Sequence, residues 1–148
     1  MLVREAKTHD LNLIVKFQLE MAKETEGVEL NQNTVEQGVA AVLEDSAKGK
    51  YYVAETENNI IGSLLTTYEW SDWRNGTVLW IQSVYISPEH RRKGVYTKLY
   101  QYIKTIVLSD NNLKGIRLYA DKSNIVAHKV YQKLGMTPDH YLTFEWLK

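Results

Sequence analysis

Apolar residues recur along the chain at two different spacings, which predict where helices and strands lie. After a short, partly alternating segment, Leu2–Ala6, the residues Ile14, Phe17 and Met21 fall on one helical face. Thr8 precedes them and is a candidate N-cap. The chain is therefore expected to begin with a strand followed by a helix.

A second helix is predicted by a capping pattern. Thr34 stands three residues before Gln37, as in a capping box, and Val35–Leu43 holds apolar residues at helical spacing. Between the two helices, Glu24–Asn33 is polar and irregular, so we expect an exposed loop there. Loops in such positions often carry recognition residues.

From Tyr51 onward, β-branched and aromatic residues indicate strands. Three runs of this kind lie at Tyr51–Ala54, Ile60–Tyr68 and Thr77–Ile86. Turn-forming residues separate them at Glu57–Asn59 and Asn75–Gly76. The simplest arrangement is an antiparallel meander of three strands.

Helical and alternating patterns succeed one another over the rest of the chain. They predict a helix over Val95–Val107 and a strand over Ile116–Ala120. A further helix is predicted over Asn124–Leu134 and a closing strand over Tyr141–Leu147. Ser123 or Asn124 is expected to cap the second of these helices, and Gly135 to end it. The order β-α-α-β-β-β-α-β-α-β predicts an α/β fold in which helices cover both faces of a mixed, mostly antiparallel sheet.

Composition narrows the class of protein. The chain of 148 residues has the size of one domain, so we expect a single domain over 1–148. Its 18 basic residues balance 18 acidic ones, which argues against a nucleic-acid partner. There are no cysteines, no apolar run long enough for a membrane span and no cluster of metal ligands. We expect a cytoplasmic protein without a bound metal.

The most informative stretch is a basic turn that follows a strand and leads into a helix. Arg91, Arg92 and Lys93 precede Gly94, and the helix begins there. The first amides of a helix and its positive dipole end attract anions, and glycine allows close approach. A solvated basic run is the alternative. The common dinucleotide and nucleoside-triphosphate motifs are both missing.

Two motifs carry a resemblance to a known family. Arg91-Arg92-Lys93-Gly94-Val95-Tyr96 looks like [QR]-x-x-G-x-[GA], and Asn124–Met136 looks like N-x-x-A-x-x-x-Y-x-x-x-G-[FM]. With this separation and element order, the chain resembles the GNAT superfamily of acyl-CoA N-acyltransferases. One departure is Tyr96, which stands where the family usually has Gly or Ala.

The resemblance implies a GNAT-like fold and a site for acetyl-CoA. It implies that backbone groups of Val84 and Ile86 bind the pantetheine arm, and that amides of Arg92–Tyr96 hold the pyrophosphate. Asn124 and Tyr131 are expected near the thioester. The residues predicted to contact acetyl-CoA are Val84, Tyr85, Ile86, Arg91, Arg92, Lys93, Gly94, Val95, Tyr96, Asn124 and Tyr131.

Acetylation of an amine needs a proton for the departing thiolate and a base for the amine. Tyr131 is the expected proton donor, because a phenol is protonated at neutral pH. Candidate bases are carboxylates expected to border the acceptor: Glu24, Glu26, Glu69 and Asp72. We take Glu26 and Glu69 as the leading candidates. His128 and His140 are weaker ones.

Aromatic residues concentrate around the third and fourth strands. Trp70, Trp73 and Trp80, together with Glu24 and Glu26, are predicted to bind a cationic amine. A core or interface role for the tryptophans is the alternative.

The sequence thus predicts N-acetylation of a primary amine, most simply one on a small molecule. Protein or peptide N-acetylation and a silent acyl-CoA sensor are the other interpretations. The hydrophobic segment Tyr141–Leu147 offers a sheet edge for a homodimer.

Overall fold

The computed structural model describes residues 1–57 and 59–148. The chain forms two compact units, Met1–Arg117 and Leu118–Lys148. The single-domain organisation expected from length stays a prediction. In the predicted turn Glu57–Asn59, Asn58 lies outside the described residues.

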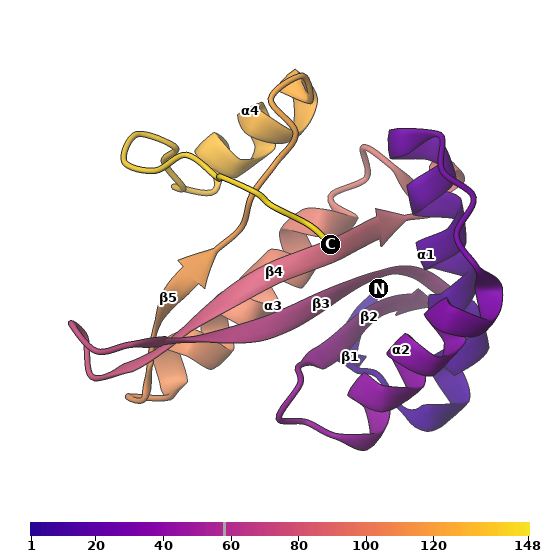
Figure 1. Ribbon diagram of the computed structural model, residues 1–148, viewed down its shortest axis with the longest axis horizontal. Coiled ribbons are helices and arrows are strands. Elements are labelled where there is room, and N and C mark those ends of the chain that lie inside the picture. Colours follow the sequence, from indigo (N-terminus) through magenta and orange to yellow (C-terminus); the bar gives the residue numbers. More distant parts are fainter. Residues whose placement is uncertain (58) are drawn as a thin grey trace. The chain divides into compact units, whose positions relative to one another are not determined.

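The first unit is built on a five-stranded sheet (Figure 1). Its strands are β1 (Leu2–Glu5), β2 (Lys50–Thr56), β3 (Asn59–Ser71), β4 (Gly76–Ile86) and β5 (Leu113–Arg117). Its helices are α1 (Leu11–Glu26), α2 (Gln32–Glu44) and α3 (Val95–Ser109), with 3-10 turns at Thr8–Asp10 and Pro88–His90. The second unit contains α4 (Ile125–Lys133).

The strands follow the order β1-β2-β3-β4-β5, and every neighbouring pair is antiparallel except β4 and β5. The predicted meander is confirmed as β2-β3-β4, because β2 pairs with β3 and β3 with β4. A mixed, mostly antiparallel sheet with helices on both faces is therefore the observed architecture, as the sequence predicted.

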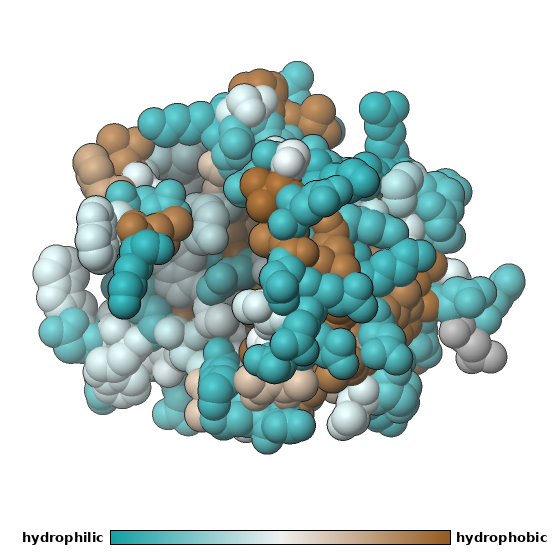
Figure 2. All heavy atoms as spheres, turned by 45° about the vertical axis from the view of Figure 1, so that its right-hand side comes forward, coloured by the Kyte–Doolittle hydropathy of each residue, from teal (hydrophilic) through white to brown (hydrophobic). Residues whose placement is uncertain are grey.

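Successive residues of β2 show which helices pack on each face of the sheet. Tyr51 and Val53 join the core of α1 and α2 together with Ile14, whereas Tyr52 points the other way and packs its ring on Tyr102 of α3, 5.8 Å between centroids. Alternation along a strand therefore places α1 and α2 on one face and α3 on the other (Figure 1). On the face shown in Figure 2, hydrophilic side chains cover most of the surface.

The start of α1 is held by a buried carboxylate. Asp10 accepts hydrogen bonds from the Arg4 guanidinium, at 2.8 and 3.1 Å, and from the Lys7 amide at 2.7 Å. Burial opposes ionisation of Asp10, yet these hydrogen bonds outweigh it and lower the pKa of the carboxyl. The expectation that Thr8 caps this helix is wrong, because Thr8 starts the 3-10 turn and Asp10 occupies the cap position.

The loop between the first two helices is shorter than predicted. Helix α1 runs through Glu24 to Glu26, and Gly27 ends it with a left-handed φ of 64°. The cap of α2 is Asn31, whose side chain accepts the Thr34 amide at 2.9 Å, so the predicted cap at Thr34 is wrong. Glu24 and Glu26, two of the carboxylates expected to border the acceptor, thus lie in the last turn of α1.

The second unit confirms one predicted helix and corrects one predicted strand. Asn124 caps α4 by accepting the Ala127 amide at 3.1 Å, and Gly135 follows the helix with φ 86°. The closing strand predicted over Tyr141–Leu147 is wrong, because this segment has no regular secondary structure. Its alternating pattern suits a strand, but a strand needs a neighbour for its backbone hydrogen bonds, and local sequence does not supply one.

Candidate functional site

Strands β4 and β5 pair over only part of their length. Their parallel register runs from Thr77 opposite Leu113 to Trp80 opposite Arg117, where β5 ends. Strand β4 continues to Ile86. From Ile81 to Ile86 its backbone edge on this side is not used by β5, so the first unit presents an open strand edge that a ligand with amide groups can extend.

A β-bulge lies within this open stretch. The register with β3 shifts between Gln82, opposite Leu65, and Tyr85, opposite Ser63, and Ser83 takes a left-handed φ of 50°. A non-glycine residue in this conformation costs about 1 kcal/mol or more, and strained residues of this kind cluster at functional sites. The extra residue also re-aims the strand, so that both Gln82 and Tyr85 face the side of α1.

The turn between β4 and α3 has the geometry of an anion site. After the 3-10 turn at Pro88–His90, Arg92 and Gly94 both adopt left-handed conformations, with φ of 61° and 77°. Left-handed residues bend the chain sharply just before the helix, which brings the unpaired first amides of α3 to this turn. The amides at the start of α3 have no acceptor within the helix and add its dipole at that point.

Arg91 is tied to the protein on two sides. Its Nε donates to the carbonyl of Ile86 at 2.9 Å, its Nη2 donates to Glu24 Oε2 at 2.7 Å, and its guanidinium lies 5.5 Å from the centre of the Tyr85 ring. Through these contacts Arg91 links the turn before α3 to the last turn of α1. Its predicted contact with phosphate stays a prediction. Arg92 and Lys93 are exposed at the same turn.

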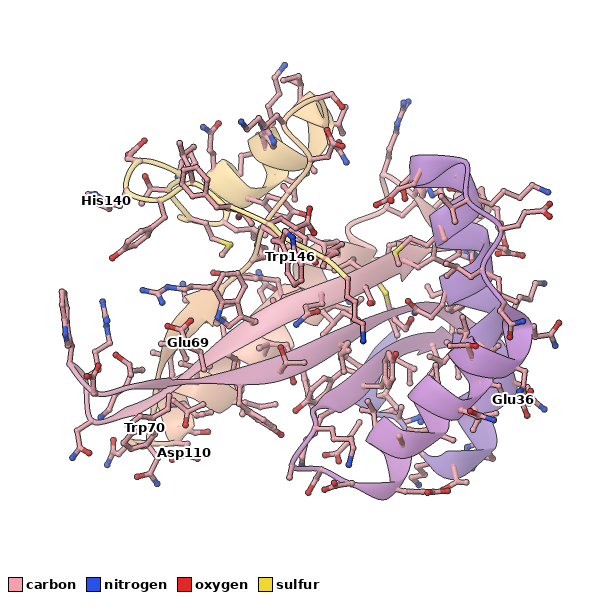
Figure 3. All side chains as sticks on the ribbon, viewed as in Figure 1. Glu36, Glu69, Trp70, Asp110, His140 and Trp146 are labelled. Carbon is pink, nitrogen blue, oxygen red and sulfur yellow. The ribbon has the colours of Figure 1, made fainter. Side chains whose placement is uncertain are left out.

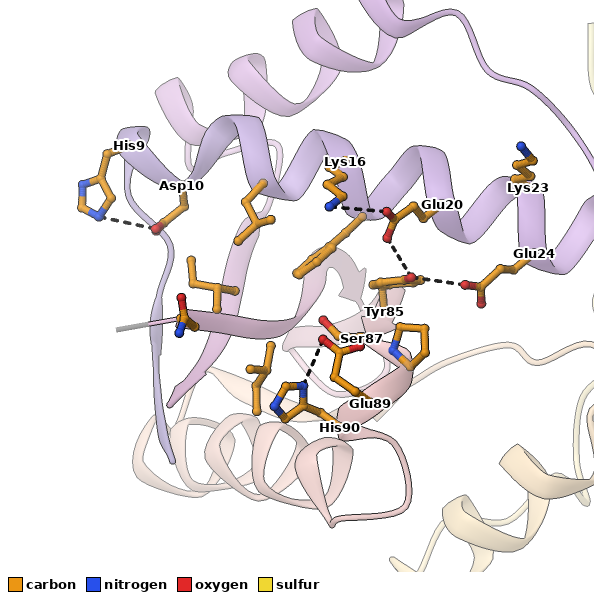
Figure 4. Close-up of a pocket in the computed structure, with 16 residues that line it drawn as sticks. His9, Asp10, Lys16, Glu20, Lys23, Glu24, Tyr85, Ser87, Glu89 and His90 are labelled. Atoms are coloured by element: carbon orange, nitrogen blue, oxygen red, sulfur yellow. Dashed lines mark hydrogen bonds and ion pairs between the residues drawn. The ribbon is translucent and has the colours of Figure 1, made fainter. Parts of the chain in front are cut away.

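Tyr85 links the open strand to α1. Its hydroxyl lies 2.8 Å from Glu20 Oε2 and 3.2 Å from Glu24 Oε1, and its ring packs on Phe17. Burial and the two carboxylates raise the pKa of the phenol, so it stays protonated. A hydroxyl has one hydrogen, so it donates to one of the two carboxylates at a time. Figure 4 shows both glutamates pointing from α1 toward this hydroxyl.

A groove runs beside this network along α1. It has a volume of about 800 Å³ and lies between α1, the start of β3 and the Ser87–His90 turn (Figure 4). Both acidic and basic side chains line it, and several of them are paired within the protein, as Lys16 is with Glu20.

Tyr96, which departs from the family pattern, lies against its own helix. Its ring centroid is 6.3 Å from that of Tyr100, and its hydroxyl oxygen is buried. The side chain is therefore directed along α3, and the backbone amide of Tyr96 is the group that remains at the turn.

Glu69 takes part in a cluster where β4 and β5 separate. Its carboxylate accepts a hydrogen bond from Trp80 Nε1 at 2.5 Å and one from Arg117 Nη1 at 2.6 Å. The hydrogen bond from Trp80 and the charge of Arg117 lower the pKa of Glu69. The side chains of Glu69 and its neighbour Trp70 leave β3 on opposite faces (Figure 3).

The predicted acceptor residues do not gather at one place. Trp70 is exposed on β3 and Trp73 lies in the β3–β4 turn, while Glu24 contacts Arg91 just beyond the other end of β4. The two ends of β4 are about 33 Å apart at roughly 3.3 Å per residue. One small acceptor cannot contact both groups.

In the second unit, the motif residues have local contacts of their own. The Asn124 side chain is used as the cap of α4, and burial raises the pKa of Tyr131 on that helix. A ring nitrogen of His128 lies 2.8 Å from the Asp121 carbonyl, which gives this histidine a structural contact. His140 lies beside the ring of Tyr141.

Sequence reasoning missed Glu20. The signal for it was available, because Glu20 stands four residues before Glu24 and therefore lies on the same helical face. The pairing of both with Tyr85 depends on how α1 crosses the sheet, which no local pattern reveals.

Two general properties of the described residues bear on the class of site. No helix among residues 1–57 and 59–148 is long and apolar enough to cross a membrane. Within the same residues, no group of three or more histidine, aspartate or glutamate side chains is placed to hold a metal ion.

Comparison with known proteins relates this geometry to a family. Residues 15–136 match the model of the acetyltransferase (GNAT) family. The structure of a possible acetyltransferase from Clostridium difficile 630 is 46% identical, with a TM-score of 0.92 over 99% of this chain and 97% of that one. A search of curated protein sequences finds no match.

More distant structures share the fold alone. A predicted acetyltransferase with acetyl-CoA from Clostridium acetobutylicum is 22% identical, with a TM-score of 0.76 over 97% of this chain and 95% of that one. A ribosomal-protein-alanine N-acetyltransferase from Brucella melitensis biovar Abortus 2308 is 13% identical, with a TM-score of 0.80 over 99% and 100% of the two chains. The family match over most of the sequence and the relative of 46% identity establish that this chain belongs to the acetyltransferase (GNAT) family.

Proposed function

We propose that the protein is a cytoplasmic N-acetyltransferase that moves the acetyl group of acetyl-CoA to a primary amine of a small molecule. The observation that carries the proposal is the turn before α3, where the left-handed Arg92 and Gly94 lead directly into the unpaired amides at the start of the helix. A pyrophosphate group fits such a cradle, because it offers several acceptor oxygens and negative charge.

The open edge of β4 supports the same ligand. Beyond Trp80 the backbone of β4 has no neighbour in β5, and it leads directly to the turn. A pantetheine arm carries amide groups and can extend the sheet along Val84 and Ile86. One lone pair of the Ile86 carbonyl is taken by Arg91, which leaves its second lone pair and the Val84 groups for this contact.

Acetyl-CoA supplies an activated thioester: the amine nitrogen bonds to the acyl carbon, the carbon–sulfur bond breaks, and the sulfur leaves with a proton. Tyr131 is the residue proposed to provide that proton. Burial raises the pKa of its phenol, so the hydroxyl keeps its hydrogen through neutral pH. Asn124 supports the position of this residue by capping α4.

Glu26 and Glu69 remain the proposed bases, and the structure gives a reason to rank them. Glu69 is held by Trp80 and Arg117, which lower its pKa and make it a weaker proton acceptor. Glu26 is exposed in the last turn of α1. Glu26, acting directly or through water, is therefore the stronger candidate.

The acceptor is proposed to bind near the end of α1 rather than at the β3–β4 turn. Glu24 contacts Arg91 at the turn before α3, and Glu26 lies two residues further along α1, so the two carboxylates leave the helix in different directions. A protonated amine suits either carboxylate. Trp70 and Trp73 lie at the far end of β4, and Trp80 lies about 20 Å from the near end at roughly 3.3 Å per residue, so of the three tryptophans Trp80 is the nearest along β4 to the end of α1.

The experiment is a transfer assay with purified protein and acetyl-CoA. Release of CoA thiol is followed against polyamines, amino acids, other small amines and peptides, and products are weighed by mass spectrometry. Turnover with a small amine and a product heavier by one acetyl group supports the proposal. Turnover with peptides only would indicate a peptide acetyltransferase. Tight binding of acetyl-CoA without turnover on any amine would indicate a sensor, and both results would overturn the proposal.

A further inference from the structure

The side chain of Arg91 closes a short loop between the end of β4 and the turn before α3. Its Nε donates, at 2.9 Å, to the carbonyl of Ile86, which is the last residue of β4. Between these two residues the chain makes the 3-10 turn Pro88–His90. Arg92, the next residue, takes the left-handed conformation that begins the turn into α3. Arg91 therefore fixes where the strand edge ends relative to that turn.

Glu24 holds the side chains of Arg91 and Tyr85, which lie on the two sides of Ile86 in the sequence. Its Oε2 accepts from Arg91 Nη2 at 2.7 Å, and its Oε1 lies 3.2 Å from the Tyr85 hydroxyl (Figure 4). The Arg91 guanidinium in turn lies 5.5 Å from the centre of the Tyr85 ring. All of these contacts join residues of the first unit, Met1–Arg117. The last turn of α1 is thus connected through two side chains to the end of β4.

The contacts of Arg91 differ from those of an arginine that serves a phosphate. Such an arginine directs its planar fork of N–H groups toward the anion. Here the fork of Arg91 is divided between the Ile86 carbonyl and the Glu24 carboxylate, and this carboxylate already provides its counter-ion. Transfer of Arg91 to a phosphate would break the ion pair and leave the Ile86 carbonyl without this donor.

We infer that Arg91 and Glu24 are a positioning pair for the pantetheine arm of acetyl-CoA, and that Arg91 does not contact the phosphates. The inference rests on the proposed function, in which the arm extends the sheet along Val84 and Ile86. Arg91 holds the Ile86 carbonyl and Glu24 holds Arg91, so the pair sets the direction of backbone groups that receive the arm. A preorganised edge binds more tightly, because less conformational freedom is lost on binding.

The first test is the effect of Glu24→Ala on acetyl-CoA affinity, because the two roles of Arg91 predict opposite signs. If Arg91 bound phosphate, loss of the Glu24 charge would release it, and acetyl-CoA would bind more tightly. If the pair positions Ile86, the same change weakens binding, by at least about fivefold. Glu29→Ala is the matched control, because it removes an exposed carboxylate three residues beyond the end of α1. Calorimetry at constant ionic strength should show wild-type affinity for this control.

The second test uses acetyl-pantetheine, which carries the thioester and the amide groups of the arm but no phosphate. Arg91→Ala should weaken binding of acetyl-pantetheine and of acetyl-CoA by the same factor, at least about fivefold. Arg92→Ala should weaken acetyl-CoA alone, since Arg92 is exposed at the turn proposed for the pyrophosphate. The double variant of Glu24 and Arg91 should bind no more weakly than Arg91→Ala, because Glu24 acts through Arg91. Circular dichroism should show the wild-type fold in each variant, since the ion pair is partly exposed.

The outcomes separate this inference from the proposed function. A wild-type protein that binds neither ligand would overturn both. Unchanged or tighter acetyl-CoA binding in Glu24→Ala would overturn the inference alone, as would additive losses in the double variant. The same holds if Arg91→Ala weakens acetyl-CoA but leaves acetyl-pantetheine affinity unchanged. A wild-type protein that binds acetyl-CoA but not millimolar acetyl-pantetheine would also overturn the inference, because the arm would then contribute no measurable affinity.

Discussion

Arg91 Nη2 lies 2.7 Å from Glu24 Oε2, and this ion pair joins the turn before α3 to the last turn of α1. The same guanidinium holds the carbonyl of Ile86 through its Nε. A residue that the sequence assigned to phosphate binding is therefore placed to fix the shape of the turn. It also connects the proposed phosphate site with the carboxylates proposed for the acceptor.

The ion pair itself should contribute little to stability, because both side chains are more than 40% exposed. We expect a coupling free energy of about 0.2–1 kcal/mol between Arg91 and Glu24. Urea unfolding of Arg91→Ala, Glu24→Ala and the double variant measures it. A coupling above about 2 kcal/mol would show that the pair behaves as a buried one, against its observed exposure.

Asp10 should matter far more to folding, because its carboxylate is buried and accepts three hydrogen bonds. Asp10→Asn should lower the free energy of unfolding by about 2–3 kcal/mol, since an amide nitrogen replaces one of the buried oxygens that accept from Arg4 and Lys7, and Arg4 keeps only Glu55 as a charged partner. Asp45→Asn removes an exposed carboxylate that pairs with Lys48 and should cost less. Urea unfolding at neutral pH compares the two variants.

The same carboxylate should set part of the acid sensitivity of the fold. The pKa of Asp10 is lowered in the folded protein, so its stabilisation is present above the unfolded-state pKa of about 3.9 and is lost as pH falls through the folded value. Stability of the wild type should therefore fall more steeply below about pH 4 than that of Asp10→Asn. Identical slopes for the two proteins would contradict this assignment.

Tyr131→Phe tests the proposed proton donor, because it keeps the ring and removes only the hydroxyl. Affinity for acetyl-CoA should be largely retained, while kcat falls by about 10²- to 10⁴-fold. Stopped-flow measurements of a single turnover separate chemistry from product release. Wild-type kcat in this variant, with chemistry limiting, would remove Tyr131 from the mechanism.

Glu69→Gln and Glu26→Gln compare the two proposed bases. Glu69 is engaged by Trp80 and Arg117 and has a lowered pKa, so we expect its replacement to reduce kcat/KM by less than about tenfold. Replacement of Glu26 should have the larger effect. The measurement is kcat/KM across pH with the best amine found, and a reversed order of the two variants would assign the base to Glu69.

The sequence predicted the elements of the first unit well where the pattern is local. The meander β2-β3-β4 and the helix after Gly94 follow from alternation and from the glycine at the cap, and both are observed. The helix starts at Thr8 and Thr34 were misplaced, because Asp10 and Asn31 compete for the cap positions and their geometry decides the outcome.

The site was predictable only in part. The basic residues of the turn and Gly94 are adjacent in the sequence, so their proximity in the structure can be predicted without knowing the fold. The contacts of Arg91 with Glu24 and of Tyr85 with Glu20 join positions more than sixty residues apart, and they depend on the crossing of α1 over the sheet. Local sequence also does not reveal how far apart two distant segments lie. The sequence therefore predicts one acceptor site for Glu24 and Trp73, although the length of β4 separates them.

Calorimetric titration of acetyl-CoA into Gly94→Val tests whether acetyl-CoA binds at the turn before α3. Gly94 has φ 77° and free space where a Cβ would lie, so valine acts through backbone strain of about 1–2 kcal/mol rather than through collision. Gly27→Val is the matched control, because Gly27 has φ 64° and equally free space at the end of α1. We expect Gly94→Val to weaken acetyl-CoA binding at least tenfold, while Gly27→Val, with a similar loss of stability, should bind like the wild type. Unchanged affinity in Gly94→Val, or an equal loss in both variants, would contradict binding of acetyl-CoA at the turn before α3.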